Sequence, residues 1–382
     1  MNENLRRWLP WIGIGAAVLV VIAIIVAGGG GGETPEAGTS TTAAETSTTA
    51  GEATTTSQPE ETTTTAPPAE PVKVGMAYDI GGRGDKSFND SAAAGLDKAK
   101  ADFGIEAKEL EPSAGGENRE ENLRLLAEAG YNPVFAIGFA FAEAVDRAAQ
   151  DFPETTFAIV DSVVEQPNVL SLVFAEHEGS ALVGAAAALK SETGKIGFIG
   201  GVNIGLIQKF EAGYRWGAQQ VNPDIEILST YLTEPPDFSG FNDPAKGKEA
   251  ALAMFEQGAD IVYHAAGGSG TGLFQAAKEV SEQTGSKVWG IGVDSDQYNT
   301  VDPELQDYVL TSMLKRVDVA VYTTIKNFVE GVEQEGVIVF NLESDGVGYS
   351  TSGGFVDDIV DQLEELKGKI VSGELEVPDA LG

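Results

Sequence analysis

Several polar and aromatic residues stand directly after short apolar runs, where a buried strand would end and a loop would begin. The run VKVGMAYD ends on Asp79 and opens into the glycine-rich segment IGGRGDKSFND, which carries Ser87, Phe88 and Asn89. Ser87 and Asn89 are residue types that cap helix N-termini, so local structure explains one of them. Phe88 has no such explanation, because it is a large aromatic residue in a polar loop. An aromatic ring at a cleft can stack on a flat ligand.

Two further apolar runs end on a carboxylate. TFAIVD ends on Asp161, and KVWGIGVD ends on Asp294. A carboxylate at the end of a buried strand needs hydrogen-bond partners, and either a ligand or the following turn can supply them for Asp161. Asp294 suits a sugar, because a carboxylate can accept hydrogen bonds from two neighbouring hydroxyl groups. Both residues are therefore candidate contacts for a polar ligand.

Other candidates have a structural explanation as well. Phe139 follows PVFAI and suits a core position as well as a ligand contact. Gly267 and Gly268 open the segment GGSGTG, whose amides can meet an anion or an oxygen-rich ligand. That segment lacks the Lys-Ser/Thr pair of a P-loop, and Leu273 replaces the third glycine of a dinucleotide fingerprint, so a tight turn also explains it. Lys315 is either a ligand contact or a solvated helix lysine.

The composition argues against catalysis, metal binding and nucleic-acid binding. The chain has no cysteine, and its two histidines, His177 and His264, are far apart and without an obvious metal cluster. No G-x-S-x-G elbow or dinucleotide fingerprint is present, so we expect neither an enzyme nor a cofactor. The formal net charge is −35, which disfavours nucleic acid because phosphate binding needs Lys and Arg.

The candidate residues need a scaffold that brings strand ends together. From Val72 onward, short apolar runs alternate with amphipathic stretches such as REENLRLLAEAG and TGLFQAAKEVSEQT. That alternation predicts βαβ units and parallel sheets. A body of about 310 residues exceeds one comfortable hydrophobic core, which predicts two lobes. In open α/β sheets, ligands bind beyond the carboxyl ends of the strands, where Asp79, Asp161 and Asp294 stand.

The N-terminal part of the chain has a different character. Residues 9–27 carry no charge and are long enough to span a bilayer as a helix. Arg6 and Arg7 before them predict residues 1–8 on the cytoplasmic side. A cleaved signal peptide is the alternative, although the small-residue cleavage site is poor. Residues 28–71 are rich in Thr, Glu and Pro, which predicts a disordered stalk, so we expect a single-pass signal-anchor with its body outside the cell membrane.

The motifs of the body, taken in order, resemble those of the basic membrane protein family. They include DKSFND, FAEHEGSALVGAAAA, QKFEAGYRWG, FNDPAKGKEAA, AAGGSGTGLFQAAKE and VLTSMLKRVD. Members of this family are substrate-binding components of ABC importers, and many bind purine nucleosides. The resemblance implies a type I periplasmic-binding-protein fold, in which three crossovers join two lobes around the ligand. It implies residues 72–174 and 312–335 for lobe one, and residues 175–311 and 336–382 for lobe two.

The resemblance also implies roles for the candidates of lobe one. Asp79 and Phe88 would contact the ligand, with Phe88 stacked on the base. Ser87 and Asn89 would stand beside them. Asp161 would meet the edge of the base.

For the remaining candidates, the resemblance implies that Asp294 accepts hydrogen bonds from ribose hydroxyl groups. The amides of Gly267 and Gly268 would lie nearby, and Lys315 would add a polar contact near the hinge. Two further aromatic residues would serve as walls of the site: Phe139 and Phe210.

The sequence therefore predicts an extracytoplasmic binding protein that captures a nucleoside, most simply a purine nucleoside, for an ABC importer. Its partners would be the permease and ATPase subunits. A ligand-sensing or adhesive ectodomain of the same fold is the alternative, as is riboflavin or another small polar ligand. The chain departs from most relatives in having no cysteine for a lipid anchor, and the helix at 9–27 would replace that anchor.

Overall fold

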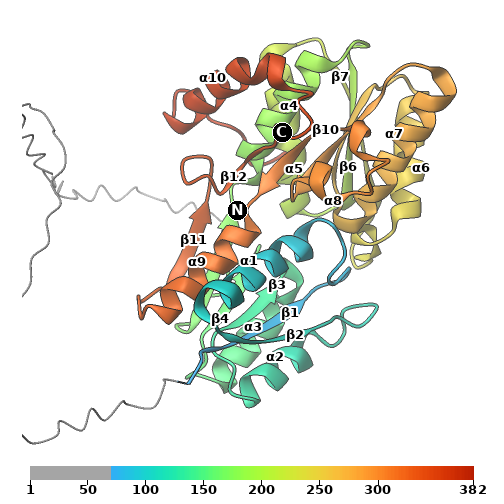
Figure 1. The fold of residues 1–382 in the computed structure, drawn as a ribbon. Coiled ribbons are helices and arrows are strands. Elements are labelled where there is room, and N and C mark those ends of the chain that lie inside the picture. The colour runs from blue at the N-terminus through green and yellow to red at the C-terminus, as the bar shows by residue number, and fades with distance from the viewer. Residues whose placement is uncertain (1–69) are drawn as a thin grey trace, which may run out of the picture. The chain divides into compact units, whose positions relative to one another are not determined.

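The computed structural model describes residues 70–382, which are built on two six-stranded sheets, one in each lobe (Figure 1). The first sheet is parallel, in the order β11 (Gly336–Phe340), β5 (Val169–Phe174), β4 (Phe157–Val160), β3 (Val134–Ile137), β1 (Lys73–Tyr78) and β2 (Glu106–Leu110). The second has the order β12 (Val347–Tyr349), β10 (Val309–Lys315), β9 (Trp289–Asp294), β8 (Ile261–Ala265), β6 (Lys195–Val202) and β7 (Glu226–Thr233). In it, β12 runs antiparallel to β10 and the other pairs are parallel. The α/β architecture of two mainly parallel sheets is confirmed.

Helices cover both faces of each sheet. In the first lobe, one face packs against α1 (Phe88–Phe103) and α9 (Val317–Val329), and the other against α2 (Arg119–Glu128) and α3 (Ala142–Asp151). In the second lobe, one face packs against α4 (Glu176–Lys190) and α5 (Gly205–Val221), and the other against α6 (Pro244–Glu256) and α7 (Thr271–Thr284). The short α8 (Gln297–Thr300) follows β9, and α10 (Val360–Val371) packs on α4.

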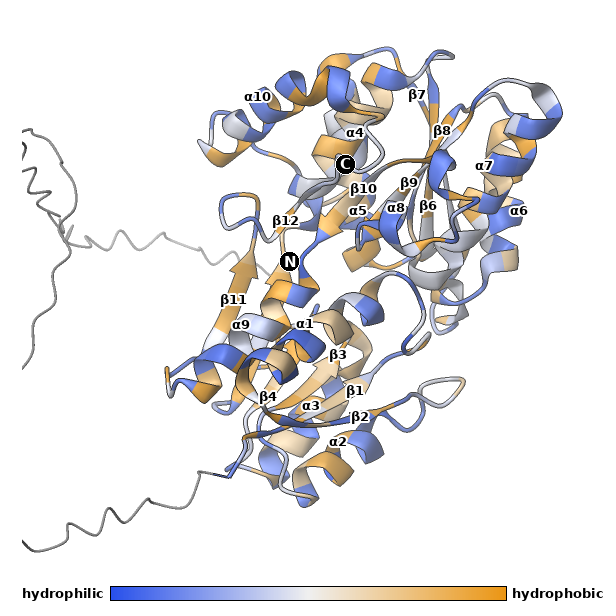
Figure 2. Ribbon diagram, in the orientation of Figure 1, coloured by the Kyte–Doolittle hydropathy of each residue, from blue (hydrophilic) through white to orange (hydrophobic). Residues whose placement is uncertain are grey.

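The central strands form where apolar residues predominate, whereas the edge strand β2 (EAKEL) carries three charged residues. All residues of β4 are fully buried, as expected for a central parallel strand that is covered on both faces. Figure 2 shows that apolar residues concentrate in the strands, whereas polar residues run along the outer helices. The helices α4 and α5 approach so closely that a Cβ on Gly213 would lie 2.0 Å from the carbonyl oxygen of His177, which explains the glycine there.

Three crossovers connect the lobes, after β5, after β10 and after β11. The lobe boundaries predicted at residues 312 and 336 both lie a few residues too early in the chain. β10 stays paired with β9 as far as Leu314, and the whole of β11 is paired with β5. The crossings therefore follow Lys315 and Phe340. An apolar run in the sequence shows that a strand exists, but the sheet it joins is decided by backbone pairing over long distances in the chain.

The predicted membrane-spanning helix at 9–27, the residues 1–8 before it and nearly all of the predicted stalk at 28–71 lie outside the described residues. Within residues 70–382, no helix combines the length and the apolar composition that a bilayer crossing requires. Residues 70–72 lead without regular structure into β1.

Candidate functional site

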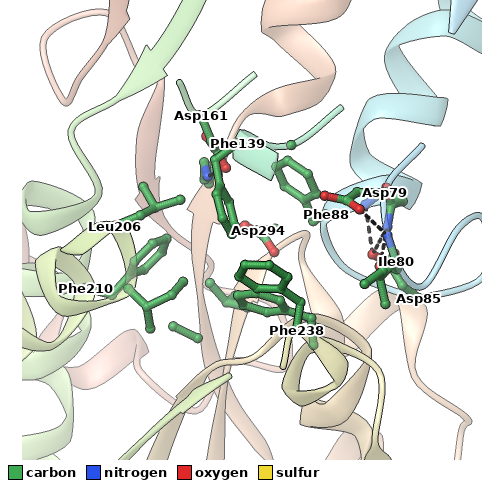
Figure 3. A pocket seen from close by; sticks show the side chains of 18 residues that line it. Asp79, Ile80, Asp85, Phe88, Phe139, Asp161, Leu206, Phe210, Phe238 and Asp294 are labelled. Atoms are coloured by element: carbon green, nitrogen blue, oxygen red, sulfur yellow. Dashed lines mark hydrogen bonds and ion pairs between the residues drawn. The ribbon is translucent and has the colours of Figure 1, made fainter. Parts of the chain in front are cut away.

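A pocket with about 690 Å³ of empty space, part of it open to solvent, lies where the two lobes face each other (Figure 3). Its walls come from the segments that follow β1, β3 and β4 in the first lobe and from the ends of β8, β9 and β10 in the second. In Figure 3, Asp79 and Phe88 lie on one side of the pocket, and Leu206 and Phe210 lie on the other.

Most of the residues predicted from the sequence line this pocket: Asp79, Phe88, Asn89, Phe139, Asp161, Phe210, Gly267, Asp294 and Lys315. Ser87 and Gly268 are buried but are not among the lining residues. The parallel sheets explain this convergence, because the carboxyl ends of neighbouring parallel strands meet at one edge of the sheet.

The two strand-end carboxylates share an unusual backbone conformation. Asp161 follows β4 with φ of 68°, and Asp294 ends β9 with φ of 62°. A positive φ is uncommon for residues with a side chain, and such strain concentrates at functional sites. One carboxylate comes from each lobe, and both are held at the pocket by the same strand-to-loop geometry.

Lys315 is the cation at the deep end of the pocket. Its Nζ lies 2.5 Å from Asp161 Oδ2 and 3.7 Å from Glu176 Oε1. The lysine ends a strand and is only 2 % exposed, so it is not a solvated helix residue. Burial would lower the pKa of the ammonium group, but Asp161 and Glu176 raise it above its usual value, and the side chain stays charged.

Asp294 is held by Ser87 from the opposite lobe. Ser87 Oγ donates a hydrogen bond of 2.5 Å to Asp294 Oδ2. Burial raises the pKa of the Asp294 carboxyl to about 6, although Lys315 and the Ser87 hydrogen bond oppose the change. At neutral pH the carboxylate is therefore ionised, and Ser87 orients it at the edge of the pocket.

Asp79 is oriented by Arg119, which the sequence did not single out. Arg119 Nε lies 2.9 Å from Asp79 Oδ1, and the Ile80 amide donates to the same oxygen at 2.8 Å. A Cβ on Gly138, whose φ is 126°, would come within 3.0 Å of Asp79 Oδ2. The glycine thus leaves room for the second carboxylate oxygen at the wall of the pocket.

The start of α1 is stabilised by Asp85, and not by Ser87 or Asn89. The Asp85 carboxylate accepts hydrogen bonds from the amides of Ser87 (2.9 Å), Asn89 (2.8 Å) and Asp90 (3.1 Å). Burial raises the pKa of Asp85, and those amides oppose the change. Asn89 Nδ2 donates to Asp85 as well, whereas Asn89 Oδ1 is buried without a partner.

Aromatic rings from both lobes meet at the pocket. Phe139 packs edge-on against Phe238 at 5.7 Å and Phe241 at 6.2 Å between ring centroids. Phe238 and Phe241 belong to the loop TEPPDFSGFND, and the sequence reasoning missed them as site residues. The signal that picked out Phe88, a large aromatic in a polar loop, was present there too.

Hydrogen bonds join the two lobes beside the pocket. They connect the backbone carbonyl groups of Lys86 and Ser87 with side chains of the second lobe, and we call this set of contacts the latch. Gln297 Nε2 donates to the carbonyl oxygen of Lys86 at 3.0 Å, and Thr300 Oγ1 donates to it at 3.2 Å. Ser295 Oγ donates to the carbonyl oxygen of Ser87 at 2.9 Å. The lobes are therefore in the closed arrangement.

The site has few groups suited to catalysis or metal binding. Within residues 70–382, no group of three or more His, Cys, Asp or Glu side chains could hold a metal ion. His264 is buried with Nε2 2.8 Å from Gln297 Oε1, and burial lowers its pKa to about 4. His264 is thus a neutral core residue that supports the latch through Gln297.

Comparisons with known proteins agree with this geometry. Residues 72–380 match the family model Bmp, described as "ABC transporter substrate-binding protein PnrA-like". The chain is 36% identical over 319 residues to the "ABC transporter nucleoside-binding protein BmpA" of Lactococcus lactis subsp. cremoris, with 80% of this chain and 89% of that protein covered. It is 34% identical over 301 residues to "Basic membrane protein A2" of Borrelia garinii, with 77% and 85% covered.

A solved structure has the same fold. It is an ABC transporter solute-binding protein from Aeropyrum pernix, similar with a TM-score of 0.71 and 32% identity over 81% of this chain and 94% of that one. The family model covers nearly the whole described body, and the pocket lies at the strand ends in both lobes. The chain therefore belongs to the PnrA-like family of ABC transporter substrate-binding proteins.

Proposed function

We propose that this protein captures a nucleoside, with a purine base preferred, in the pocket between its lobes. The observation that carries the proposal is the pair of buried strand-end carboxylates, Asp161 from one lobe and Asp294 from the other. A ligand that donates hydrogen bonds at both ends fits them, and a nucleoside does so with its base edge and its ribose hydroxyl groups.

The charges around the pocket favour an uncharged ligand that is rich in donors. Among the described residues that line the pocket, Lys315 is the single cation, and its charge is already shared with Asp161 and Glu176. Asp161 Oδ1 and Asn89 Oδ1 are buried acceptors without a partner. A phosphate or carboxylate in this place would face carboxylates without a free cation, which argues against nucleotides and acidic ligands.

The aromatic residues suit the base. Phe88 faces the pocket from the start of α1, and Phe139 approaches it from the loop after β3. Flat rings stack favourably on such side chains. We assign Asp161 to the base edge and Asp294 to the ribose, with Asp79 and Asn89 as further polar contacts. The relative from Lactococcus lactis is named a nucleoside-binding protein, which supports the same ligand class.

Isothermal titration calorimetry of the full-length chain in detergent tests this proposal. The ligands are adenosine, guanosine, inosine, adenosine monophosphate and riboflavin. We expect at least one purine nucleoside to bind, and the monophosphate to bind far more weakly than adenosine. Binding of riboflavin alone, or of no nucleoside at all, would refute the assignment.

We further propose that residues 9–27 anchor the protein in the cell membrane with the body on the extracytoplasmic face, where it delivers its ligand to a permease with an ATPase. Three relatives from Pyrococcus species are named lipoproteins, whereas this chain has no cysteine to carry a lipid. Protease treatment of intact cells should remove the body and leave a short membrane fragment. Release of the intact body into the medium would indicate a cleaved signal peptide instead.

A further inference from the structure

The deepest part of the site holds a charge cluster that spans two of the crossovers. Glu176 begins α4 just after the first crossover, and Lys315 ends β10 just before the second. Asp161, which follows β4, completes the cluster on the side of the first lobe. Lys315 also lies within 5.0 Å, 5.1 Å and 5.6 Å of three aromatic ring centroids, those of Phe88, Phe174 and Phe210. The ammonium group is thus enclosed by rings on several sides and by carboxylates on the others.

The cluster contains more acid than base. Three carboxyl groups, those of Asp161, Glu176 and Asp294, share the single ammonium group of Lys315. The Glu176 side chain is 1 % exposed, its Oε1 is 3.7 Å from Lys315 Nζ, and its Oε2 is buried without a partner. Asp161 and Asp294 have closer polar contacts than Glu176 has. Burying unpaired negative charge is costly, so Glu176 is the carboxyl that best retains a proton.

We propose that Glu176 is a positioning residue whose proton decides how Lys315 is shared between the two carboxyl groups beside it, and that ligand affinity thereby depends on pH. The inference rests on the proposed function. When Glu176 is neutral, Lys315 pairs with Asp161 alone, and this pair joins the two lobes. When Glu176 is ionised, it competes with Asp161 for Lys315 and adds a negative charge behind the pocket.

The direction of the pH effect follows from desolvation. A neutral ligand replaces water next to the cluster. The loss of that water raises the free-energy cost of ionising Glu176, because the ionised form of the cluster carries one more negative charge. The ligand therefore prefers protonated Glu176, and its affinity falls as pH rises.

The titration range of Glu176 supports this direction. Burial raises the pKa of Glu176 to about 7, while Lys315 opposes the change and Asp161 adds to it. The other groups that face Glu176 are Lys209 from α5 and Tyr263 from β8. Burial keeps the pKa of Tyr263 well above its usual value, so that group stays neutral throughout the range of interest. Asp294, with a pKa of about 6, titrates mostly below this range, and its remaining ionisation has the opposite effect, because an ionised carboxylate accepts hydrogen bonds from the ligand more strongly.

The test is calorimetry on the full-length chain with the nucleoside that binds most tightly, at pH 6.5, 7.25 and 8.0, for the natural protein, E176Q and E178Q. The Glu178 side chain accepts a hydrogen bond from the Leu342 amide, which a glutamine can also do, so E178Q is a matched control on the same helical turn. We expect the natural protein and E178Q to lose about threefold or more in affinity over this range, since one linked proton allows at most about tenfold per pH unit. E176Q should show no fall in affinity over this range.

A second measurement stands independently of how well E176Q folds. Titration of the natural protein at pH 7 in phosphate and in Tris, whose ionisation enthalpies differ, should reveal uptake of a fraction of one proton on binding. Zero uptake, or an E176Q variant that keeps the pH dependence of the natural protein, would overturn the role of Glu176. Absence of nucleoside binding at every pH would instead overturn the proposed function.

Discussion

Under the proposed function, Asp294 is the residue that best separates recognition of a nucleoside from recognition of a free base. Its carboxylate lies at the end of β9 and is oriented by Ser87. Replacing it by alanine should cost the equivalent of one hydrogen bond from a ribose hydroxyl group to a charged acceptor, about 1.5–3 kcal/mol. We expect D294A to weaken adenosine binding by roughly tenfold to a hundredfold. Binding of adenine, measured in the same calorimeter, should change much less, and equal losses for both ligands would remove the ribose role.

The contrast between Asp79 and Arg119 shows what residue patterns can reveal. Asp79 was predicted as a site residue because it ends an apolar run, and the position of a run is a local property of the sequence. Arg119 orients that carboxylate from a separate helix, 40 residues later. No local pattern joins the two residues, so the partner could be found only when the fold brought α2 to the end of β1. Lys315 was ambiguous for the same reason, since a lysine at the end of a strand and a lysine on a helix look alike in the sequence.

At the level of elements, the latch connects ligand binding to lobe closure. Its hydrogen bonds join a first-lobe loop to the segment around α8 in the second lobe, so they exist only when the lobes are closed. We expect S295A, which removes the bond from Ser295 Oγ to the Ser87 carbonyl oxygen, to weaken nucleoside binding about fivefold, the equivalent of one ordinary hydrogen bond of about 1 kcal/mol.

The effect should fall on dissociation and not on folding. Stopped-flow kinetics should show a faster release of ligand, while the melting temperature of the ligand-free protein stays nearly constant. S372A is a suitable control, because the Ser372 hydroxyl donates to the Lys369 carbonyl oxygen at an exposed helix end. A lowered melting temperature with unchanged affinity would assign Ser295 to the stability of one lobe.

The elements themselves were largely predictable, and their assembly was predictable only in part. Alternating apolar runs and amphipathic stretches indicate βαβ units, because the spacing of apolar residues in each element can be recognised within a short stretch of sequence. The predicted positions of the crossings that follow Lys315 and Phe340 were wrong, because the sheet that a strand joins depends on pairing with strands far away in the chain. The hydrogen bond from Ser87 to Asp294 spans 207 positions in the chain, so no local pattern could reveal it. The loop that carries Phe238 and Phe241 likewise reaches the pocket from the second lobe.

At the scale of the whole molecule, binding and shape are linked because each lobe holds part of the pocket. Asp161 belongs to the first lobe, and Asp294 and Lys315 end strands of the second. A ligand that contacts both lobes stabilises the closed arrangement by its differential affinity for it. The pair formed by Lys315 and Asp161 already bridges the lobes near the crossovers, so closure requires little rearrangement at the deep end of the site.

The charge of the molecule leads to a last prediction, about salt. The chain carries 59 acidic and 24 basic residues, so repulsion between like charges opposes the compact state. Exposed ion pairs contribute little in return, about 0–1 kcal/mol each. Raising the ionic strength to 1 M shortens the screening length to about 3 Å, which should weaken the repulsion more than it weakens the pairs. We therefore expect the melting temperature to rise by about 5 °C between low salt and 1 M KCl.

A variant with fewer exposed acids separates repulsion from a general salt effect. Glu128 on α2, Asp224 in the loop between α5 and β7, and Glu256 on α6 are exposed and lie outside the pocket. The triple variant E128Q/D224N/E256Q should melt higher than the natural protein at low salt and respond less to KCl, because it begins with less repulsion to screen. Equal salt responses in calorimetric melts of the two proteins would assign the effect to ion hydration. Affinity for the proposed nucleoside should change little with salt in either protein, because a nucleoside is uncharged and the cluster around Lys315 is shielded from the solvent ions that screen the surface.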